Sequence, residues 1–128
     1  MRSFYTAVLY LLTPLALLRL LRRGLADRGY WRRWSERFGF VAAPAQTGAI
    51  WVHAVSVGEV QAAAPLIRAL RRRAPVMVTT TTPTGSRQVR RLFGDEVLHA
   101  YVPYDLPGAV CRFLRRVRPR LLVVLETE

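Results

Sequence analysis

Four short apolar segments alternate with three segments whose apolar residues recur at helical spacing, and this alternation constrains the fold more than any other feature. The apolar segments are residues 49–55, 76–82, 97–102 and 120–126. The helical segments between them are residues 59–73, 84–93 and 106–117. Near-continuous apolar strands separated by helices are typical of a parallel sheet covered on both faces. Because crossovers between parallel strands are right-handed, the sequence predicts an α/β fold with a Rossmann-like half.

Proline and glycine mark the borders of these segments. Residues 42–48, which are small and include Pro and Gly, form a natural linker before the first strand. The second helix is expected to be entered through residues 82–86 and to end at Gly94. Pro65 lies inside the first helical segment, where its missing N–H predicts a kink or a tight first half.

The chain carries a strong positive charge. Its 128 residues suffice for one domain with a real core, and its net charge is +12, with 20 basic residues that are all Arg. This balance predicts an anionic partner, which is nucleic acid, a phosphorylated substrate or an acidic membrane surface. The single cysteine, Cys111, excludes an intrachain disulfide and is expected to be packed. The only histidines, His53 and His99, lack partners at metal-ligand spacing, so we expect no metal site.

The amino terminus has the composition of a membrane-associated helix. Residues 4–18 carry no charge and would form a helix about 22 Å long, against about 30 Å for the hydrocarbon core of a bilayer. Seven arginines follow within residues 19–37, together with two acidic residues. Such a basic flank belongs on the cytoplasmic side of a membrane and attracts anionic lipid.

Three interpretations fit this segment: a membrane anchor that spans or half-inserts, a helix buried in the core, or a cleaved signal peptide. The positive charge follows the apolar run, whereas a signal peptide carries it before the run. Arginines close to the helix end disfavour burial. We therefore expect a membrane-anchor helix over residues 1–23, a basic amphipathic segment and linker over 24–44, and an incomplete Rossmann-like domain over 45–128. Trp31 and Trp34 suit either a helix at the lipid headgroups or packing against the domain.

The polar motifs follow the carboxyl ends of the expected strands, where parallel α/β sheets bind their ligands. Ser56 and Glu59 have the spacing of a capping box, in which each side chain satisfies a backbone N–H group at the helix start. The same strand-to-helix loop also suits a general base. Spacing alone favours the cap.

Residues 82–86 provide hydroxyls, a glycine and a second helix N-terminus, which together make a good anion site. We expect the ligand-binding residues to come from both loops: Ser56, Gly58, Thr82, Thr84, Gly85 and Ser86. The Walker pattern and GxGxxG are absent, so we expect no nucleotide binding by this half.

Glu126, at the end of the last expected strand, is a second candidate for chemistry. Carboxylates of Glu59 and Glu126 that face each other across a crevice can work as a general base and an electrostatic stabiliser of a cation-like transition state. A solvated strand end is the simpler interpretation of Glu126, and spacing alone favours it. His53 is expected to be a hydrogen-bonded structural residue.

Five motifs, in their order and intervals, resemble those of one enzyme family. They are WSERFGF (34–40), HAVSVGE (53–59), TTTTPTGS (79–86), YVPYDLP (101–107) and LETE (125–128). With the apolar amino terminus, they make the whole chain similar to the 3-deoxy-D-manno-octulosonic acid (Kdo) transferases of Gram-negative bacteria. Ser35 stands where that family often has Gly. Because the family continues into a second domain after these motifs, we expect the chain to be a fragment.

The resemblance implies a GT-B glycosyltransferase, with this chain as the amino-terminal, acceptor-binding half. The implied reaction transfers Kdo from CMP-Kdo to a lipid A precursor with inversion, without a cofactor or bound metal, at the cytoplasmic face of the inner membrane. The family's catalytic base corresponds to Glu59, and its transition-state stabiliser corresponds to Glu126. The implied partners are the lipid A precursor, CMP-Kdo through the missing domain, and anionic inner-membrane lipid, with no nucleic acid. Without the donor-binding half, we expect residues 1–128 to be inactive.

Two alternatives stay open at this point. One belongs to a different class of protein: a non-catalytic module, rich in Arg and Trp, that binds an anionic membrane or nucleic acid. The other is a GT-B enzyme with another acceptor, because the two loops do not identify the sugar.

Overall fold

A computed structural model describes residues 2–26, 33–44 and 48–125 of the chain. Its four parallel strands are β1 (Ile50–Ala54), β2 (Val76–Thr80), β3 (Leu98–Tyr101) and β4 (Leu121–Leu125). Its helices are α1 (Arg2–Ala26), α2 (Val57–Arg71), α3 (Pro83–Phe93) and α4 (Pro107–Val117), with short 3-10 turns η2 (Trp34–Phe38) and η3 (Gly94–Glu96). The expected parallel α/β fold is therefore confirmed.

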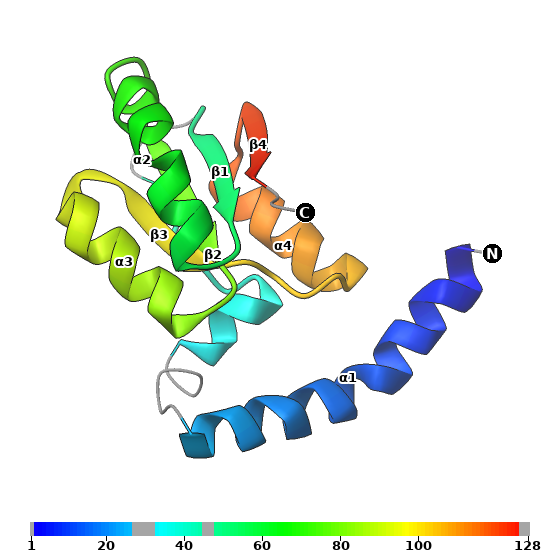
Figure 1. Cartoon of the computed structure of the whole chain (residues 1–128). Coiled ribbons are helices and arrows are strands. Elements are labelled where there is room, and N and C mark those ends of the chain that lie inside the picture. Colours follow the sequence, from blue (N-terminus) through cyan, green and yellow to red (C-terminus); the bar gives the residue numbers. More distant parts are fainter. Residues whose placement is uncertain (1, 27–32, 45–47, 126–128) are drawn as a thin grey trace.

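The sheet has helices on both faces, as the apolar strands predict. Figure 1 shows α2 and α3 side by side over one face, and α4 on the other face together with η2. The strand order is β3-β2-β1-β4, so the chain builds outward from β1 to β3 and then crosses back to place β4 on the other side of β1. In open parallel sheets, this reversal point is where a crevice forms at the carboxyl ends of the strands.

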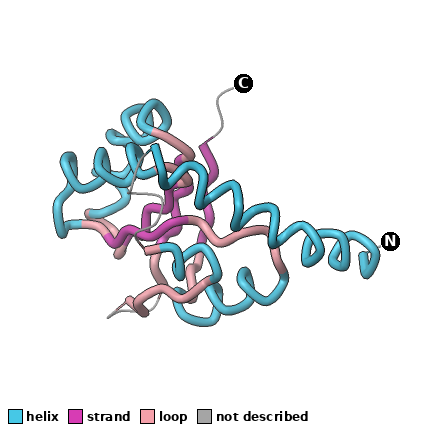
Figure 2. The backbone as a smooth tube through the Cα atoms, turned by 90° about the horizontal axis from the view of Figure 1, so that it is seen from below, coloured by secondary structure: helices cyan, strands magenta, loops and turns pink. Residues whose placement is uncertain are grey.

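Helix α1 runs across one side of the domain and extends beyond it toward the N-terminus (Figure 2). Pro14 lies inside α1, and the helix bends near its middle in Figure 1, because proline cannot donate the hydrogen bond of a regular turn. The hydroxyl of Tyr5 reaches the domain and donates to Asp105 at 2.6 Å. The outward side of α1 keeps several large apolar side chains exposed, among them Phe4, Leu11 and Leu15.

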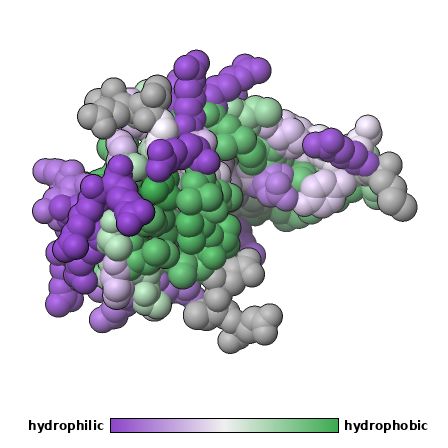
Figure 3. Space-filling model, turned by 90° about the horizontal axis from the view of Figure 1, so that it is seen from above, coloured by the Kyte–Doolittle hydropathy of each residue, from purple (hydrophilic) through white to green (hydrophobic). Residues whose placement is uncertain are grey.

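No helix within the described residues is long and apolar enough to cross a membrane. The expected membrane anchor over residues 1–23 is therefore not confirmed. On the α/β domain itself, Figure 3 shows an apolar area bordered by hydrophilic side chains.

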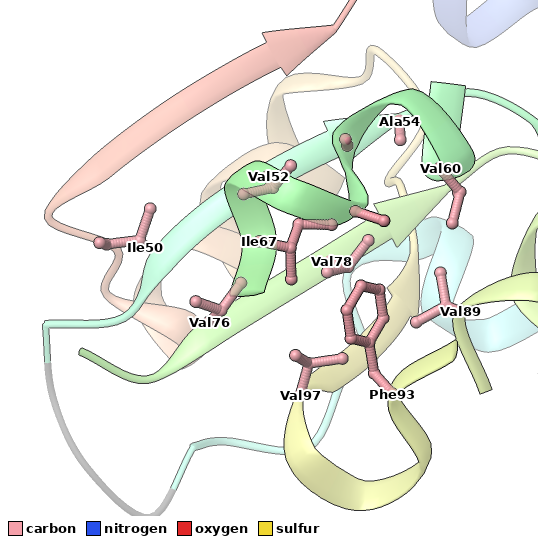
Figure 4. Close-up of a cluster of buried hydrophobic side chains, with 12 residues drawn as sticks. Ile50, Val52, Ala54, Val60, Ile67, Val76, Val78, Val89, Phe93 and Val97 are labelled. Carbon is pink, nitrogen blue, oxygen red and sulfur yellow. The ribbon is translucent and has the colours of Figure 1, made fainter. Parts of the chain in front are cut away.

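The larger core lies between the sheet and the α2/α3 layer. Figure 4 shows Val60 and Ile67 from α2, and Val89 and Phe93 from α3, gathered over the apolar face of β1 and β2. A second cluster on the opposite face joins the strands to α4: it consists of Val41, Trp51, Met77, Ala100, Phe113 and Val117. The central strands β1 and β2 are therefore buried on both sides, which explains why β2 is apolar or threonine throughout.

The observed elements are close to the predicted ones, with systematic differences at their ends. Strands β1, β2 and β3 end one or two residues before their predicted segments do, because those residues leave the sheet to form loops, and β1, β3 and β4 start one residue later than predicted. Helix α2 starts two residues earlier than its predicted segment and continues through Pro65, whose side chain is exposed. Gly94 follows the last residue of α3, as predicted.

Residues 33–44 pack against the α/β domain. Arg37 and Val41 are both buried, and η2 lies against α4. Trp34 is half exposed and meets Phe38 edge-on, with ring centroids 6.0 Å apart, whereas Trp31 lies outside the described residues. The expectation that Cys111 is packed is wrong, because its side chain is exposed on α4.

Candidate functional site

The loop after β1 places Glu59 in the first turn of α2. Ser56 is the N-cap residue, and its backbone N–H donates to Oε2 of Glu59 at 3.1 Å. The Ser56 hydroxyl donates to the same oxygen. The Ser56 side chain also faces the backbone N–H of Glu59, so the predicted capping-box geometry is confirmed. Gly58 is exposed, and a Cβ atom there would meet nothing within 4 Å. The loop therefore presents one oriented carboxylate at a helix N-terminus.

The loop after β2 is organised by its own cap. Thr82 is the N-cap of α3: its hydroxyl accepts the Gly85 N–H at 3.1 Å and lies 3.2 Å from the hydroxyl of Thr84. Gly85 is buried, and a Cβ there would come within 3.1–3.3 Å of Thr80 and Thr82. A side chain at this position would therefore force Thr80 or Thr82 to shift by a few tenths of an ångström. The half-buried hydroxyl of Ser86 is hydrogen-bonded to the guanidinium of Arg33 at 3.2 Å.

Backbone hydrogen bonds hold these loops together at the carboxyl edge of the sheet. The N–H of Thr81 donates to the carbonyl of Val55 at 2.9 Å, which joins the β2 loop to the residue before Ser56. The N–H of Val102 donates to the carbonyl of Thr80 at 3.0 Å and joins the β3 end to the same edge. The six predicted ligand-binding residues therefore belong to two connected loops.

Glu126 lies outside the described residues. The residue before it, Leu125, is paired with Ala54 in the register between β4 and β1. The carboxyl end of β4 is therefore the immediate neighbour of the β1 end, from which the Ser56–Glu59 loop departs. These two strand ends flank the reversal point of the sheet.

His53 has the structural role that its position predicted. Its Nδ1 lies 2.9 Å from the hydroxyl of Thr79, and that hydroxyl also accepts the indole N–H of Trp51 at 2.8 Å. Thr79 is fully buried. The three side chains thus form a polar bridge between β1 and β2 inside the sheet's apolar surroundings.

His99 forms a second polar network, between β3 and the start of α3. The Arg33 guanidinium donates to Nδ1 of His99 at 2.9 Å, so His99 is the neutral tautomer that carries its proton on Nε2 and donates to Thr80 at 2.9 Å. Burial, the largest cause, and the nearby positive charges of Arg33 and Arg90 together lower the pKa of His99 to about 3. A cavity of about 280 Å³ is lined in part by His99, Arg33, Arg90 and Ser86.

The η2 turn contributes residues that the sequence analysis did not assign to the site. The carboxylate of Glu36 accepts the backbone N–H of Tyr101 at 3.0 Å, and Arg37 donates to the carbonyl of Thr81 at 2.9 Å. Arg37 was counted among the arginines expected to attract lipid, and its burial makes that expectation wrong for this residue. The motif WSERFGF, which carries both residues, was the available signal.

The assembled edge combines groups suited to proton transfer and anion binding. The Glu59 carboxylate can accept a proton, and the N-termini of α2 and α3 direct their first N–H groups toward the same edge of the sheet. Among residues 2–26, 33–44 and 48–125, no group of three or more His, Cys, Asp or Glu side chains is placed to hold a metal ion.

Comparisons with a family model and with individual proteins point to the same family. Residues 32–128 match the family model described as 3-deoxy-D-manno-octulosonic-acid transferase (kdotransferase). The chain is 44% identical, over 99% of its length, to the 3-deoxy-D-manno-octulosonic acid transferases of Haemophilus influenzae and Bordetella pertussis. It is 36% identical, over 97% of its length, to a probable mitochondrial enzyme of the same name from Arabidopsis thaliana. It spans 31%, 32% and 29% of the lengths of these three relatives.

Proposed function

The chain belongs to the Kdo transferase family, and on this premise we propose that it is the acceptor-binding half of an inverting glycosyltransferase of GT-B type. The proposed reaction transfers Kdo from CMP-Kdo to a hydroxyl of a lipid A precursor. The observation that carries the proposal is the position of Glu59, an oriented carboxylate in the loop beside the β1/β4 reversal point.

Glu59 is the proposed general base. It removes the proton of the acceptor hydroxyl as the oxygen attacks the anomeric carbon of Kdo, the bond from that carbon to the phosphate oxygen breaks, and CMP leaves from the opposite side. The two hydrogen bonds from Ser56 to Oε2 fix the direction of the carboxylate, which supports this role. A residue that caps a helix can also act as a base, because one ionised carboxylate can accept the cap hydrogen bond and take a proton.

Glu126 is the proposed stabiliser of the cation-like transition state. Its chain neighbour Leu125 pairs with Ala54, and Ala54 is two residues from the cap of α2. The proposal therefore requires two carboxylates on adjacent strand ends, one on each side of the reversal point.

The loop of residues 82–86 is proposed to bind the acceptor, together with Ser56 and Gly58. A lipid A precursor is anionic, and backbone N–H groups at a helix N-terminus favour negative charge. Thr82, Thr84, Gly85 and Ser86 lie in the first turn of α3 or directly before it. The net charge of +12 further favours an anionic acceptor.

Association with the cytoplasmic face of the inner membrane completes the proposal. Helix α1 exposes Leu11 and Leu15, and its last turns carry the exposed arginines Arg19 and Arg22. Apolar and basic side chains on one helix suit a membrane interface that contains anionic lipid. CMP-Kdo would be bound by a further domain, since the chain spans about a third of the length of its relatives.

The test is Kdo transfer from CMP-Kdo to a lipid A precursor by the complete gene product, with Glu59→Gln compared with the wild type. Glutamine still accepts the Ser56 N–H in the capping box but cannot take a proton. We expect kcat to fall at least about 100-fold with little change in the melting temperature. Gln61→Glu, an exposed change on the same helix, serves as the control and should transfer like the wild type.

Two results would contradict the proposal. Undiminished transfer by the Glu59→Gln variant would leave Glu59 as a cap only. Transfer by residues 1–128 alone would show that the donor needs no further domain.

A further inference from the structure

The η2 turn connects both proposed substrate loops, although it lies far from them in the sequence. Its Glu36 and Arg37 are separated from β2 by about forty residues and from β3 by about sixty. The motif that contains them has no role in the chemistry proposed above. What this turn does for the two loops is therefore open to inference.

Arg37 holds the end of β2. Arg37 is buried, with 3% of its surface exposed; its guanidinium lies over the Tyr101 ring at 4.4 Å from the centroid and donates to the carbonyl of Thr81 at 2.9 Å. That carbonyl directly precedes Thr82, the cap of α3. Arg37 therefore fixes the peptide from which the 82–86 loop departs. An arginine this deeply buried is not placed to bind a ligand directly.

The same peptide region also reaches the loop of Glu59. The N–H of Thr81 donates to the carbonyl of Val55 at 2.9 Å, and the next residue, Ser56, donates its N–H to Glu59. A hydrogen-bonded path thus leads from Arg37 through Thr81 and Val55 to the carboxylate. Displacing Thr81 would alter the backbone position of both loops together.

The end of β3 is held by the same turn. The Glu36 carboxylate accepts the Tyr101 N–H at 3.0 Å, and the backbone carbonyl of Arg37 accepts the Tyr104 N–H at 2.7 Å. Glu36 is itself held by an ion pair with Arg33 at 3.0 Å. Consecutive residues of one turn therefore bind the carboxyl ends of two neighbouring strands.

We propose that Arg37 is a positioning residue of the transferase site, which sets the geometry of both the Glu59 loop and the 82–86 loop through the Thr81 peptide. The proposal rests on the function proposed above for those two loops. Misplacement of reacting groups by about 1 Å can lower a rate by about 100-fold, so a residue that touches no substrate can still control the reaction.

The first test uses residues 1–128 and measures amide hydrogen exchange by NMR in the wild type, Arg37→Met and Arg116→Met. Arg116 is the matched control: it also donates to a backbone carbonyl, that of Val41 at 3.1 Å, but it contacts neither loop. In Arg37→Met we expect exchange at Thr81 and Ser56 to accelerate at least about tenfold, with exchange in the middle of β1 and β2 unchanged. Equal acceleration throughout the sheet, or none at Thr81, would overturn the proposal.

The second test uses the complete gene product and separates kcat from the two KM values. We expect Arg37→Met to lower kcat/KM for the lipid acceptor at least about tenfold while the KM for CMP-Kdo stays within about twofold, and Arg116→Met to behave like the wild type. Arg37→Lys keeps the charge and one donor to Thr81, so it should recover part of the loss and replaces Arg37→Met where that variant does not fold. Unchanged kcat/KM in a folded Arg37→Met enzyme would overturn the positioning role.

The two proposals fail in different ways. A wild-type enzyme that transfers no Kdo contradicts the proposed function, and the exchange experiment then still decides whether Arg37 holds the loops. An active wild type with an unaffected Arg37→Met variant contradicts only the inference about Arg37.

Discussion

His99 is a neutral, half-buried histidine that lies between Arg33 and the hydroxyl of Thr80. Its protonation would place a third positive charge beside Arg33 and Arg90 and would remove the acceptor that Arg33 uses. The histidine therefore links the stability of the domain to pH. The position of His99 in the sequence does not predict this dependence on pH, because the side chains that contact it belong to residues 33 and 80 in other segments.

We predict that the domain loses stability as the pH falls from about 6.5 to about 3. The pKa of His99 is about 3 in the folded chain and about 6.5 when unfolded, so between these values the unfolded state binds more protons. The free energy of unfolding should therefore decrease by at most about 1.4 kcal/mol for each pH unit lost. Urea titrations of residues 1–128 at several pH values measure this slope.

The control is His99→Gln, which retains a hydrogen-bonding side chain but does not titrate. Carboxylates contribute to the acid dependence of both proteins, so the difference between the two slopes isolates His99. Equal slopes for the wild type and His99→Gln between pH 4 and 6 would contradict the prediction.

At the scale of elements, the sequence predicted those features that depend on interactions between residues close together in the chain. The alternation of apolar and helical segments gave the order of strands and helices, and the Ser56–Glu59 spacing gave the capping box. The sequence did not predict the η2 turn, because residues distant in the chain hold it in place. The side chain of Arg37 donates to the carbonyl of Thr81, and that of Arg112 in α4 donates to the carbonyl of Phe38 at 2.6 Å. Spacing alone favours the cap for Glu59 and does not identify the base, because a cap and a base occupy the same position.

Gly39 shows how tightly η2 is docked against α4. Its φ is +85°, and a Cβ atom there would lie 2.3 Å from the carbonyl oxygen of Ala109. Both the backbone conformation and the close approach exclude a side chain. The glycine of WSERFGF therefore has a packing role that the motif alone did not reveal.

We predict that Gly39→Ala destabilises the domain more than Gly48→Ala does. Gly48 also has a positive φ, +80°, but the atom nearest to its Cβ position is the Cδ of Arg120 at 3.7 Å. Both variants incur the cost of about 1–2 kcal/mol for a left-handed non-glycine residue, and only Gly39→Ala adds the collision with α4. Urea unfolding should give a free energy lower for Gly39→Ala by at least about 1 kcal/mol relative to Gly48→Ala. Equal losses would mean that η2 moves away from α4 freely.

At the scale of the whole molecule, the proposed membrane helix passes close to the edge of the sheet that carries the proposed chemistry. The two loops lie at the carboxyl edge of the sheet, and α1 reaches this edge where Tyr5 donates to Asp105, a residue of the loop after β3 (Figures 1 and 2). The outward residues Phe4, Leu11, Leu15 and Leu18 are each more than half exposed. Their spacing keeps them on one side of the helix, so the exposed apolar residues form a continuous stripe.

We predict that residues 1–128 bind vesicles of phosphatidylethanolamine and phosphatidylglycerol through this stripe. Burying an exposed leucine contributes about 1.5–3 kcal/mol, so the double variant Leu11→Gln/Leu15→Gln should weaken binding by at least about tenfold in a sedimentation assay. Leu66→Gln, which changes an exposed leucine on α2, is the control and should bind like the wild type. Raising the salt concentration should weaken binding only in part, because the arginine contribution is screened and the apolar one is not. Generic RNA that binds more tightly than the vesicles, with a steep salt dependence and no effect of the double variant, would instead favour a non-catalytic nucleic-acid-binding module.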